Sequence, residues 1–355
     1  MTRRTLTLVA AGLLLIALVC VAALRPVPYV TMQPGPVQDT LAEVDGREIV
    51  AIGDAKVYPT KGQLDLTTVS VTSPDADLSI GEAIGAWLDP DQAVLPREVI
   101  YPPSQSVEEA QQQSSVEMTT SQHEAAAAAL SELGYDISFD VTVVEVLEDA
   151  PAQGHLRAGD VILEVGGEAV SEASEVAELL QAVEPGEQAT LTVRRDGKRT
   201  TVTTPTGTAP DDAGRTIVGI QIAEEPDLPF DVDIELGNQI GGPSAGLMFS
   251  LAIIDKLTPG ALTGGLHIAG TGEIDVDGEV DPIGGIQQKI AGANEAGADV
   301  FLVPAQNCDE AVRADDADEI NLVRVSNLDQ ARTAVEALAD DPDAGPEDGV
   351  LACTA

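Results

Sequence analysis

A serine in the C-terminal half of the chain has surroundings that suit nucleophilic catalysis. Ser244 lies in Gly241-Gly242-Pro243-Ser244-Ala245-Gly246, which predicts a turn opening into a helix. The expected buried face of that helix carries Leu247, Leu251 and Ile254. Small neighbours leave room for a peptide backbone, and N–H groups at a helix start suit an oxyanion. We therefore predict Ser244 as a nucleophile, with N–H groups around Gly242 and Ser244 as oxyanion donors.

A lysine further along the chain has the setting of a general base. Gly284-Gly285 predicts a turn before a helix, and Lys289 lies beside its apolar positions Ile286, Ile290 and Ala293. Apolar surroundings disfavour the charged ammonium and lower its pKa. A base that works near neutrality needs a drop of roughly 3 units, which costs about 4 kcal/mol.

Both residues also have ordinary structural interpretations. Gly-Pro-Ser before a helix is commonly an N-cap, and a helical lysine commonly packs its stem and keeps its ammonium in water. The residues alone leave both interpretations open.

The order of several motifs resembles the proteolytic domain of Lon-type proteases. The matching segments are Gly242-Pro243-Ser244-Ala245-Gly246, Thr271-Gly272-Glu273-Ile274, Pro282-Ile283-Gly284-Gly285-Ile286 with Lys289, Ala296-Gly297-Ala298-Asp299 and Val303-Pro304. The likeness covers roughly residues 215 to 340. It implies a serine–lysine dyad that uses no histidine, metal or other cofactor.

The resemblance also implies roles for individual residues. Ser244 matches the family nucleophile, Lys289 the family base, and Thr271 a threonine that orients the lysine. Gly242 is expected to support the oxyanion. Gln287 replaces a non-catalytic lysine of the family pattern. Gly241 stands where many Lon enzymes carry an acidic residue, so the acidic support of the dyad is unassigned.

Two further regions precede that domain. A strand is predicted over residues 64 to 71, a short helix over 80 to 88 anchored by Trp87, and a long alanine-rich helix over 107 to 133. Pro34-Gly35-Pro36 and Leu66-Thr67-Thr68-Val69 resemble bacterial membrane-anchored, PDZ-containing Lon-like proteases.

Residues 137 to 207 resemble a PDZ domain, through Leu156-Arg157-Ala158-Gly159-Asp160-Val161-Ile162 and the strand from Val141. Such domains bind peptides by adding a strand to a sheet edge. The loop expected to hold a peptide carboxylate, residues 136 to 140, has two acids and no glycine. Peptide docking and a structural spacer both remain open.

A net charge of −42 over 355 residues excludes electrostatic binding to nucleic acid. The sequence holds no Gly-x4-Gly-Lys-Ser/Thr loop, so we expect no nucleotide and no ATPase. Lon-type domains form rings, so the resemblance makes a homo-oligomer one candidate assembly, which the sequence leaves open.

The N-terminus predicts a membrane anchor. Thr5 to Leu24 is uncharged and almost wholly apolar, with Arg3 and Arg4 before it and Arg25 after it. The positive-inside tendency places the remainder outside the cell, on a single-pass plasma-membrane protein. A cleaved signal peptide is the competing interpretation.

Two cysteines, Cys308 and Cys353, follow the apolar segment. Outside the cell they are candidates for a disulfide, and two free thiols are the alternative. Residues past Asp340 are acidic and rich in Pro and Gly, which predicts a disordered tail.

The sequence thus predicts an α+β multidomain protein. Its expected parts are a transmembrane anchor (1–25), an N-terminal extracytoplasmic region (26–136), a PDZ domain (137–207), a Lon-type protease domain (215–340) and an acidic tail (341–355). The expected function is ATP-independent serine endopeptidase activity on extracytoplasmic polypeptides. A non-catalytic PDZ scaffold of the cell envelope is the alternative.

Overall fold

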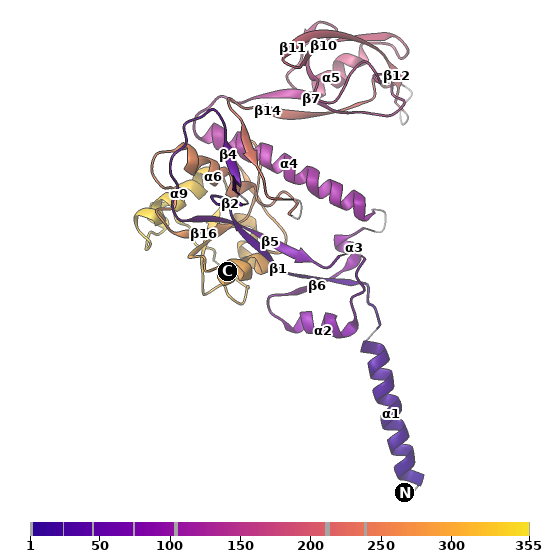
Figure 1. Ribbon diagram of the computed structural model, residues 1–355, viewed down its shortest axis with the longest axis vertical. Coiled ribbons are helices and arrows are strands. Elements are labelled where there is room, and N and C mark those ends of the chain that lie inside the picture. Colours follow the sequence, from indigo (N-terminus) through magenta and orange to yellow (C-terminus); the bar gives the residue numbers. More distant parts are fainter. Residues whose placement is uncertain are drawn as a thin grey trace. The chain divides into compact units, whose positions relative to one another are not determined.

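The computed structural model describes residues 3–23, 25–44, 46–73, 75–102, 106–209, 214–237 and 240–354. They form two compact units (Figure 1). The first combines Met1–Gly134 with Phe230–Ala355, and the second is Tyr135–Pro229. The N-terminal region expected at 26–136 is therefore part of the protease unit, and the second unit is an insertion within it.

A mixed six-stranded sheet is the centre of the first unit. Its strand order is β20 (Asn321–Val325), β19 (Val300–Pro304), β16 (His267–Gly270), β5 (Gln63–Val71), β1 (Tyr29–Asp39) and β6 (Ala93–Pro96). β16 runs parallel to β5, with His267 opposite Gln63 and Gly270 opposite Leu66. This pairing joins segments about 200 residues apart, so both halves of the first unit build one sheet.

Helices and short strand pairs complete the first unit. The helices are α1 (Arg3–Ala23), α2 (Ile80–Leu88), α3 (Arg97–Ile100), α4 (Val107–Glu132), α6 (Gly246–Leu257), α7 (Ile286–Ala296), α8 (Cys308–Ala311) and α9 (Leu328–Asp340). The short strands pair as β2 (Glu43–Val44) with β3 (Arg47–Glu48), β4 (Val50–Ile52) with β15 (Val232–Ile234), and β17 (Glu273–Ile274) with β18 (Val280–Asp281). Two 3₁₀ turns are Ala305–Asn307 and Pro346–Asp348.

The alanine-rich helix α4 packs against α6. Its predicted N-terminus is fixed by a capping box between Ser106 and Glu109. Residues Ala125–Ala129 are all buried, and Ser250 Oγ of α6 donates to the carbonyl of Ala125 at 3.0 Å. The five small side chains thus let two helices approach closely.

Helix α1 contains most of the predicted span. Its described side chains, among them Leu6, Leu13 and Leu18, are exposed. Leu24 and the side chains of residues 19–23 lie outside the described residues. Within the part of the chain that is described, no helix has both the length and the apolar character needed to cross a membrane.

Helix α2 forms where it was predicted, but Trp87 does not anchor it. The indole is 74% exposed, and its helix neighbours Ile84 and Leu88 are exposed as well. The spacing i, i+3, i+4 places all three on one helix face. The prediction of a buried anchor was wrong because the periodicity of a helix defines its apolar face without revealing what covers that face.

The second unit is a five-strand path with a helix. Its order is β11 (Lys198–Pro205), β10 (Gln188–Arg195), β8 (Val161–Val165), β7 (Ser138–Val146) and β14 (Ile220–Asp227). It also contains β9 (Glu168–Ala169), α5 (Ala173–Gln181), and the pair β12 (Gly207–Thr208) and β13 (Thr216–Ile217). β13 and β14 therefore belong here, which differs from the predicted start of the protease domain at residue 215.

The C-terminal residues are ordered, contrary to the predicted disorder. Arg324 N donates to the carbonyl of Leu351, and Cys353 N donates to that of Leu322, so the segment pairs along β20. Val350 is buried, and Cys353 is disulfide-bonded to Cys308. The prediction of disorder was wrong because it rested on acidic composition, which does not reveal that a disulfide restricts the conformations of the tail.

Candidate active site

The predicted nucleophile lies on a turn beside a large cavity of the first unit. Residues 242–245 form the turn, and α6 begins at Gly246 with Ala245 as its N-cap. Ser244 is half-buried and lines a cavity of about 900 Å³. A Cβ on Gly246 would lie 2.8 Å from Ile274 Cγ2 and 2.9 Å from Ser121 Oγ. This glycine therefore allows α4, α6 and β17 to meet behind the turn.

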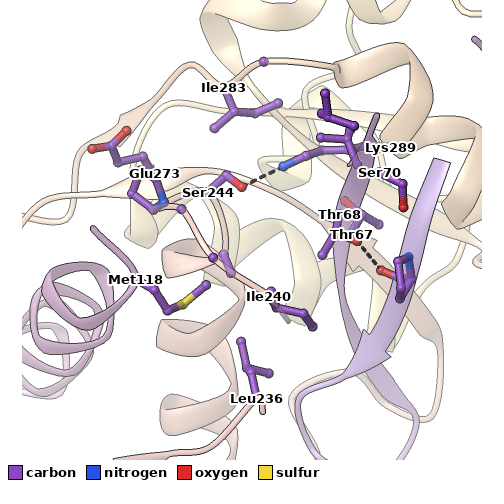
Figure 2. Close-up of a pocket in the computed structure, with 18 of the residues that line it drawn as sticks. Thr67, Thr68, Ser70, Met118, Leu236, Ile240, Ser244, Glu273, Ile283 and Lys289 are labelled. Atoms are coloured by element: carbon purple, nitrogen blue, oxygen red, sulfur yellow. Dashed lines mark hydrogen bonds between the residues drawn. The ribbon is translucent and has the colours of Figure 1, made fainter. Parts of the chain in front are cut away.

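Helix α7 brings Lys289 to that turn. Figure 2 shows the Lys289 side chain pointing toward Ser244, and its Nζ lies 2.8 Å from Ser244 Oγ. Nζ lies 2.8 Å from Thr271 Oγ1 as well. Thr271 donates its hydroxyl proton to the carbonyl of Ser244 at 2.9 Å. The structure thus brings the predicted residues Ser244, Thr271 and Lys289 together.

These contacts orient the amine. Because the Thr271 proton is committed to a carbonyl, its oxygen is left to accept an N–H from Lys289. The neutral amine can then direct its lone pair at the Ser244 hydroxyl. Thr271 is fully buried, so water does not compete for the hydrogen bonds that hold the amine in this orientation.

Burial sets the protonation state of the lysine. Lys289 is 2% exposed, and desolvation lowers the pKa of its ammonium from 10.5 to about 7. Burial favours the neutral amine because a low-dielectric interior penalises charge. A pKa near neutrality is the value at which a general base works best under physiological conditions.

The two predicted oxyanion donors differ in whether their N–H groups already make a hydrogen bond. Gly242, at φ +85°, donates its N–H to the carbonyl of Ser114 in α4 at 3.1 Å, so this donor is occupied in the present conformation. The N–H of Ser244 has no hydrogen-bond acceptor among the described residues. Of the two predicted donors, Ser244 is the one free to meet a substrate oxygen.

The sequence analysis did not foresee the part played by α4. In addition to the contact at Ser114, Ser121 Oγ donates to the carbonyl of Pro243 at 2.8 Å. Ser114 and Ser121 are seven residues apart and therefore share a helix face. That spacing was the available signal, but nothing in the sequence showed that this face meets the serine turn.

Among the described residues, one carboxyl group lines the cavity. Glu273 follows Thr271 by two residues, and burial raises the pKa of its side chain, with Asp281 and Glu117 adding to the effect. Within the described residues, the Nζ of Lys289 donates hydrogen bonds to two hydroxyls and contacts no carboxylate. The acidic residue that is missing at Gly241 is therefore not replaced by another acid in direct contact with the lysine.

A histidine–aspartate pair lies elsewhere on the sheet. His267 Nε2 is 2.6 Å from Asp65 Oδ2, and the two residues sit on adjacent strands β16 and β5. Neither residue lines the cavity that holds Ser244. The arrangement fits a structural role for His267.

The disulfide connects α8 to the C-terminal segment. Cys308 is bonded to Cys353 and belongs to a buried cluster with Ile286 and Ile290 of α7. This cluster packs behind the helix that carries Lys289. The covalent link therefore stabilises the side of the unit that positions the base.

In the second unit, the expected carboxylate loop is part of a strand. Residues 138–140 pair with Glu225–Asp227 of β14, so their backbone is already used. β14 is itself the outermost strand of the path and contacts α5. It is preceded by Gly219 at φ +76°. The sheet edge next to α5 is thus that of β14, which the sequence analysis assigned to the protease domain.

A serine hydroxyl held against a buried lysine with a lowered pKa is the arrangement found in serine–lysine hydrolase sites. Family models agree with this class. Residues 237–337 match the C-terminal proteolytic domain of Lon protease (S16), and residues 112–206 match a PDZ domain. The chain therefore carries a Lon-type serine peptidase domain together with a PDZ domain, which confirms the family likeness predicted from the motifs.

Individual proteins are similar to parts of this chain. The Lon protease of Roseiflexus castenholzii is 35% identical over 91 residues, 25% of this chain and 11% of that protein. A probable periplasmic serine endoprotease, DegP-like, of Pseudomonas fulva is 41% identical over 73 residues, 20% of this chain and 15% of that protein. The chain thus spans a small fraction of the length of these relatives. The PDZ domain of the SdrC-like protein from Listeria innocua is 29% identical, covering 23% of this chain and 92% of that structure, with a TM-score of 0.22.

Proposed function

We propose that this protein is an endopeptidase in which Ser244 is the nucleophile and Lys289 the general base. The observation that carries the proposal is the 2.8 Å contact between Lys289 Nζ and Ser244 Oγ at a buried amine whose pKa is about 7. The absence of a nucleotide-binding loop from the sequence supports action without ATP. Its substrates are then segments that are already exposed or flexible.

The reaction follows from the contacts. Neutral Lys289 removes the proton of Ser244 as Oγ attacks the scissile carbonyl. The oxyanion accepts the N–H of Ser244, and release of Gly242 from the Ser114 carbonyl would add a second donor. Lys289 then gives its proton to the leaving amine, and water hydrolyses the acyl-enzyme with Lys289 again as base.

The sheet offers a path for the substrate. β16 pairs with β5 only as far as Leu66, and beyond it the same edge of β5 has no partner strand among the described residues. Residues Thr67–Val71 of that edge line the cavity with Ser244. An extended peptide can hydrogen-bond to such an edge, which would present its carbonyl groups to the serine.

The second unit supplies a separate place for polypeptides. The outer edge of β14 is open to a further strand, and α5 lies beside it. We propose that this edge docks an extended segment of the substrate. Isothermal titration with peptides from a cleaved substrate would test it, and a Gly219→Val variant, strained at φ +76°, is expected to weaken binding.

We also propose that the protein is anchored in the plasma membrane by residues 5–24, with both units outside the cell. The uncharged segment supports this location, as do the exposed apolar side chains of α1. Ile80 N, at the start of α2, donates to the carbonyl of Arg25, the residue that would leave the bilayer. The exposed face of α2 with Trp87 would then lie at the lipid surface, where tryptophan is favoured.

Trp87 is the only tryptophan, so its fluorescence tests this location. In phosphatidylcholine vesicles its emission should shift to the blue and be quenched by brominated lipid. A Trp87→Phe chain with Val57→Trp, at another exposed position, is the matched control and should stay sensitive to aqueous acrylamide. Failure of the protein to float with vesicles would contradict the anchor, whereas flotation with a water-exposed Trp87 would contradict only the placement of α2.

Catalysis is tested by paired substitutions. Ser244→Ala and Lys289→Ala should each abolish cleavage of an unstructured protein such as casein, while Ser250→Ala, which replaces a buried serine of the helix that follows the turn, should retain it. The alternative is a non-catalytic PDZ scaffold, which retains the polypeptide partners but needs no activated serine. Full activity of either dyad variant would show that the dyad assignment is wrong, whereas no cleavage by the unsubstituted protein would favour the scaffold.

A further inference from the structure

Three residues of α4 face the nucleophile turn. The carbonyl of Ser114 accepts the N–H of Gly242, and Ser121 Oγ donates to the carbonyl of Pro243. Met118 lies between these two contacts, at positions i+4 and i−3 relative to them. Residues at this spacing share one helix face, so the Met118 side chain is directed at the segment that carries Ser244.

Met118 is one of three apolar side chains gathered beside the serine. In Figure 2, Met118, Leu236 and Ile240 lie below Ser244, whereas Lys289 lies to its right. Met118 is 7% exposed, so it is held in place by its surroundings. Met118 comes from α4, and the other two residues come from the segment before the turn, so this apolar surface is built by two separate segments of the chain.

The same three side chains also line a second cavity. It has a volume of about 410 Å³, and its other lining residues include Arg47 and Gln122. Side chains that line both cavities form the partition between them. The size of the Met118 side chain therefore limits the space beside Ser244.

The charges around the cavity disfavour acidic side chains. Glu273 lines it directly, and Glu117 lies next to Met118 on α4. A carboxylate of the substrate would be repelled by these groups and by the net charge of −42. An apolar side chain meets no such cost and gains from leaving water.

We propose that Met118, Leu236 and Ile240 form the subsite that selects the substrate residue flanking the scissile bond. It takes an aliphatic side chain of the size of leucine or methionine and rejects acidic ones. The inference rests on the proposed peptidase function. It places a specificity-determining residue on α4, outside the residues 237–337 that match the Lon proteolytic domain.

The test is cleavage-site profiling of the full chain with a defined mixture of unstructured peptides. The unsubstituted protein should cleave beside Leu and Met. Met118→Ala joins the two cavities and should raise cleavage beside Phe and Tyr, relative to Leu, by about tenfold, the usual effect of pocket size on selectivity. Met118→Phe should lower cleavage beside Leu by a similar factor and favour Ala. Val116→Ala, on the same helix but 58% exposed, should leave the profile unchanged.

Labelling with a fluorophosphonate probe distinguishes failure of the proposed subsite from failure of the proposed peptidase function. If the Met118 variants still label at Ser244 and their profiles equal that of the unsubstituted chain, the subsite is refuted while the peptidase stands. The same holds for a preference for Asp or Glu beside the scissile bond. If the unsubstituted chain neither labels nor cleaves, the proposed function fails and the subsite fails with it.

Discussion

Replacing Lys289 by methionine is expected to abolish catalysis and, at the same time, to stabilise the fold at neutral pH. The amine is buried, and its pKa falls from 10.5 to about 7. That difference of about 3.5 units corresponds to a cost of about 5 kcal/mol at 1.36 kcal/mol per unit. Methionine has a similar volume and no charge. It loses two hydrogen bonds, worth about 1 kcal/mol each, which leaves a net gain of about 3 kcal/mol.

The gain depends on pH in a direction that follows from linkage. Between pH 7 and 10.5 the unfolded chain holds a proton on Lys289 that the folded chain has released, so the stability of the unsubstituted protein rises with pH. This contribution is lost as pH falls toward 7 and is constant below it. The difference in free energy of unfolding between the variant and the parent should therefore shrink by about 1.4 kcal/mol for each unit that the pH rises above 7. It should be near zero at about pH 9.

Urea denaturation of both proteins at pH 6, 7.5 and 9 measures this gap. Taking the difference between the two removes the titration of the many carboxylates, which the two chains share. A gap that stays the same at all three pH values would refute a depressed lysine pKa. A parent that is more stable than the variant at pH 6 would contradict the cost assigned to burying the ammonium.

Three further results are expected. The kcat/KM for a peptide should rise as pH increases through about 7, because only neutral Lys289 accepts the serine proton; a profile without a step near that pH would count against it. Thr271→Val should lower kcat/KM by about 100-fold, with recovery in Thr271→Ser, since the hydroxyl orients the amine. Removing the disulfide with Cys308→Ser and Cys353→Ser should cost about 4 kcal/mol in urea denaturation for a loop of 45 residues, and an unchanged midpoint would show that the tail is held without it.

Local patterns in the sequence predicted the elements that carry the dyad. Leu247, Leu251 and Ile254 are buried in α6, but so is every other residue from Gly246 to Lys256, so the predicted single apolar face understated the burial of this helix. Gly285, at φ +70°, is the N-cap of α7. Helices are specified by residues close in sequence, so periodicity and caps define them. The ordered motifs then indicated that Ser244 and Lys289 belong to one site, which spacing alone did not.

Local sequence patterns did not predict the contacts between segments that lie far apart in the sequence. Residues 64–71 were predicted as a strand, but not that β5 would lie beside β16 and join the two halves of the first unit. β14 has the composition of a strand in either unit, so its place beside β7 became clear only from the structure. The contacts of Ser114 and Ser121 with the serine turn were hidden for the same reason, because they join segments more than 120 residues apart.

Labelling of Ser244 by a fluorophosphonate probe tests the central claim most directly. The site and extent of labelling should be read by peptide mapping in the unsubstituted chain and in Lys289→Met, both confirmed as folded by circular dichroism. The account predicts rapid modification of Ser244 in the first protein and modification slower by at least about 100-fold in the second. Equal rates in the two proteins, or modification at a different serine, would contradict activation of Ser244 by the buried amine.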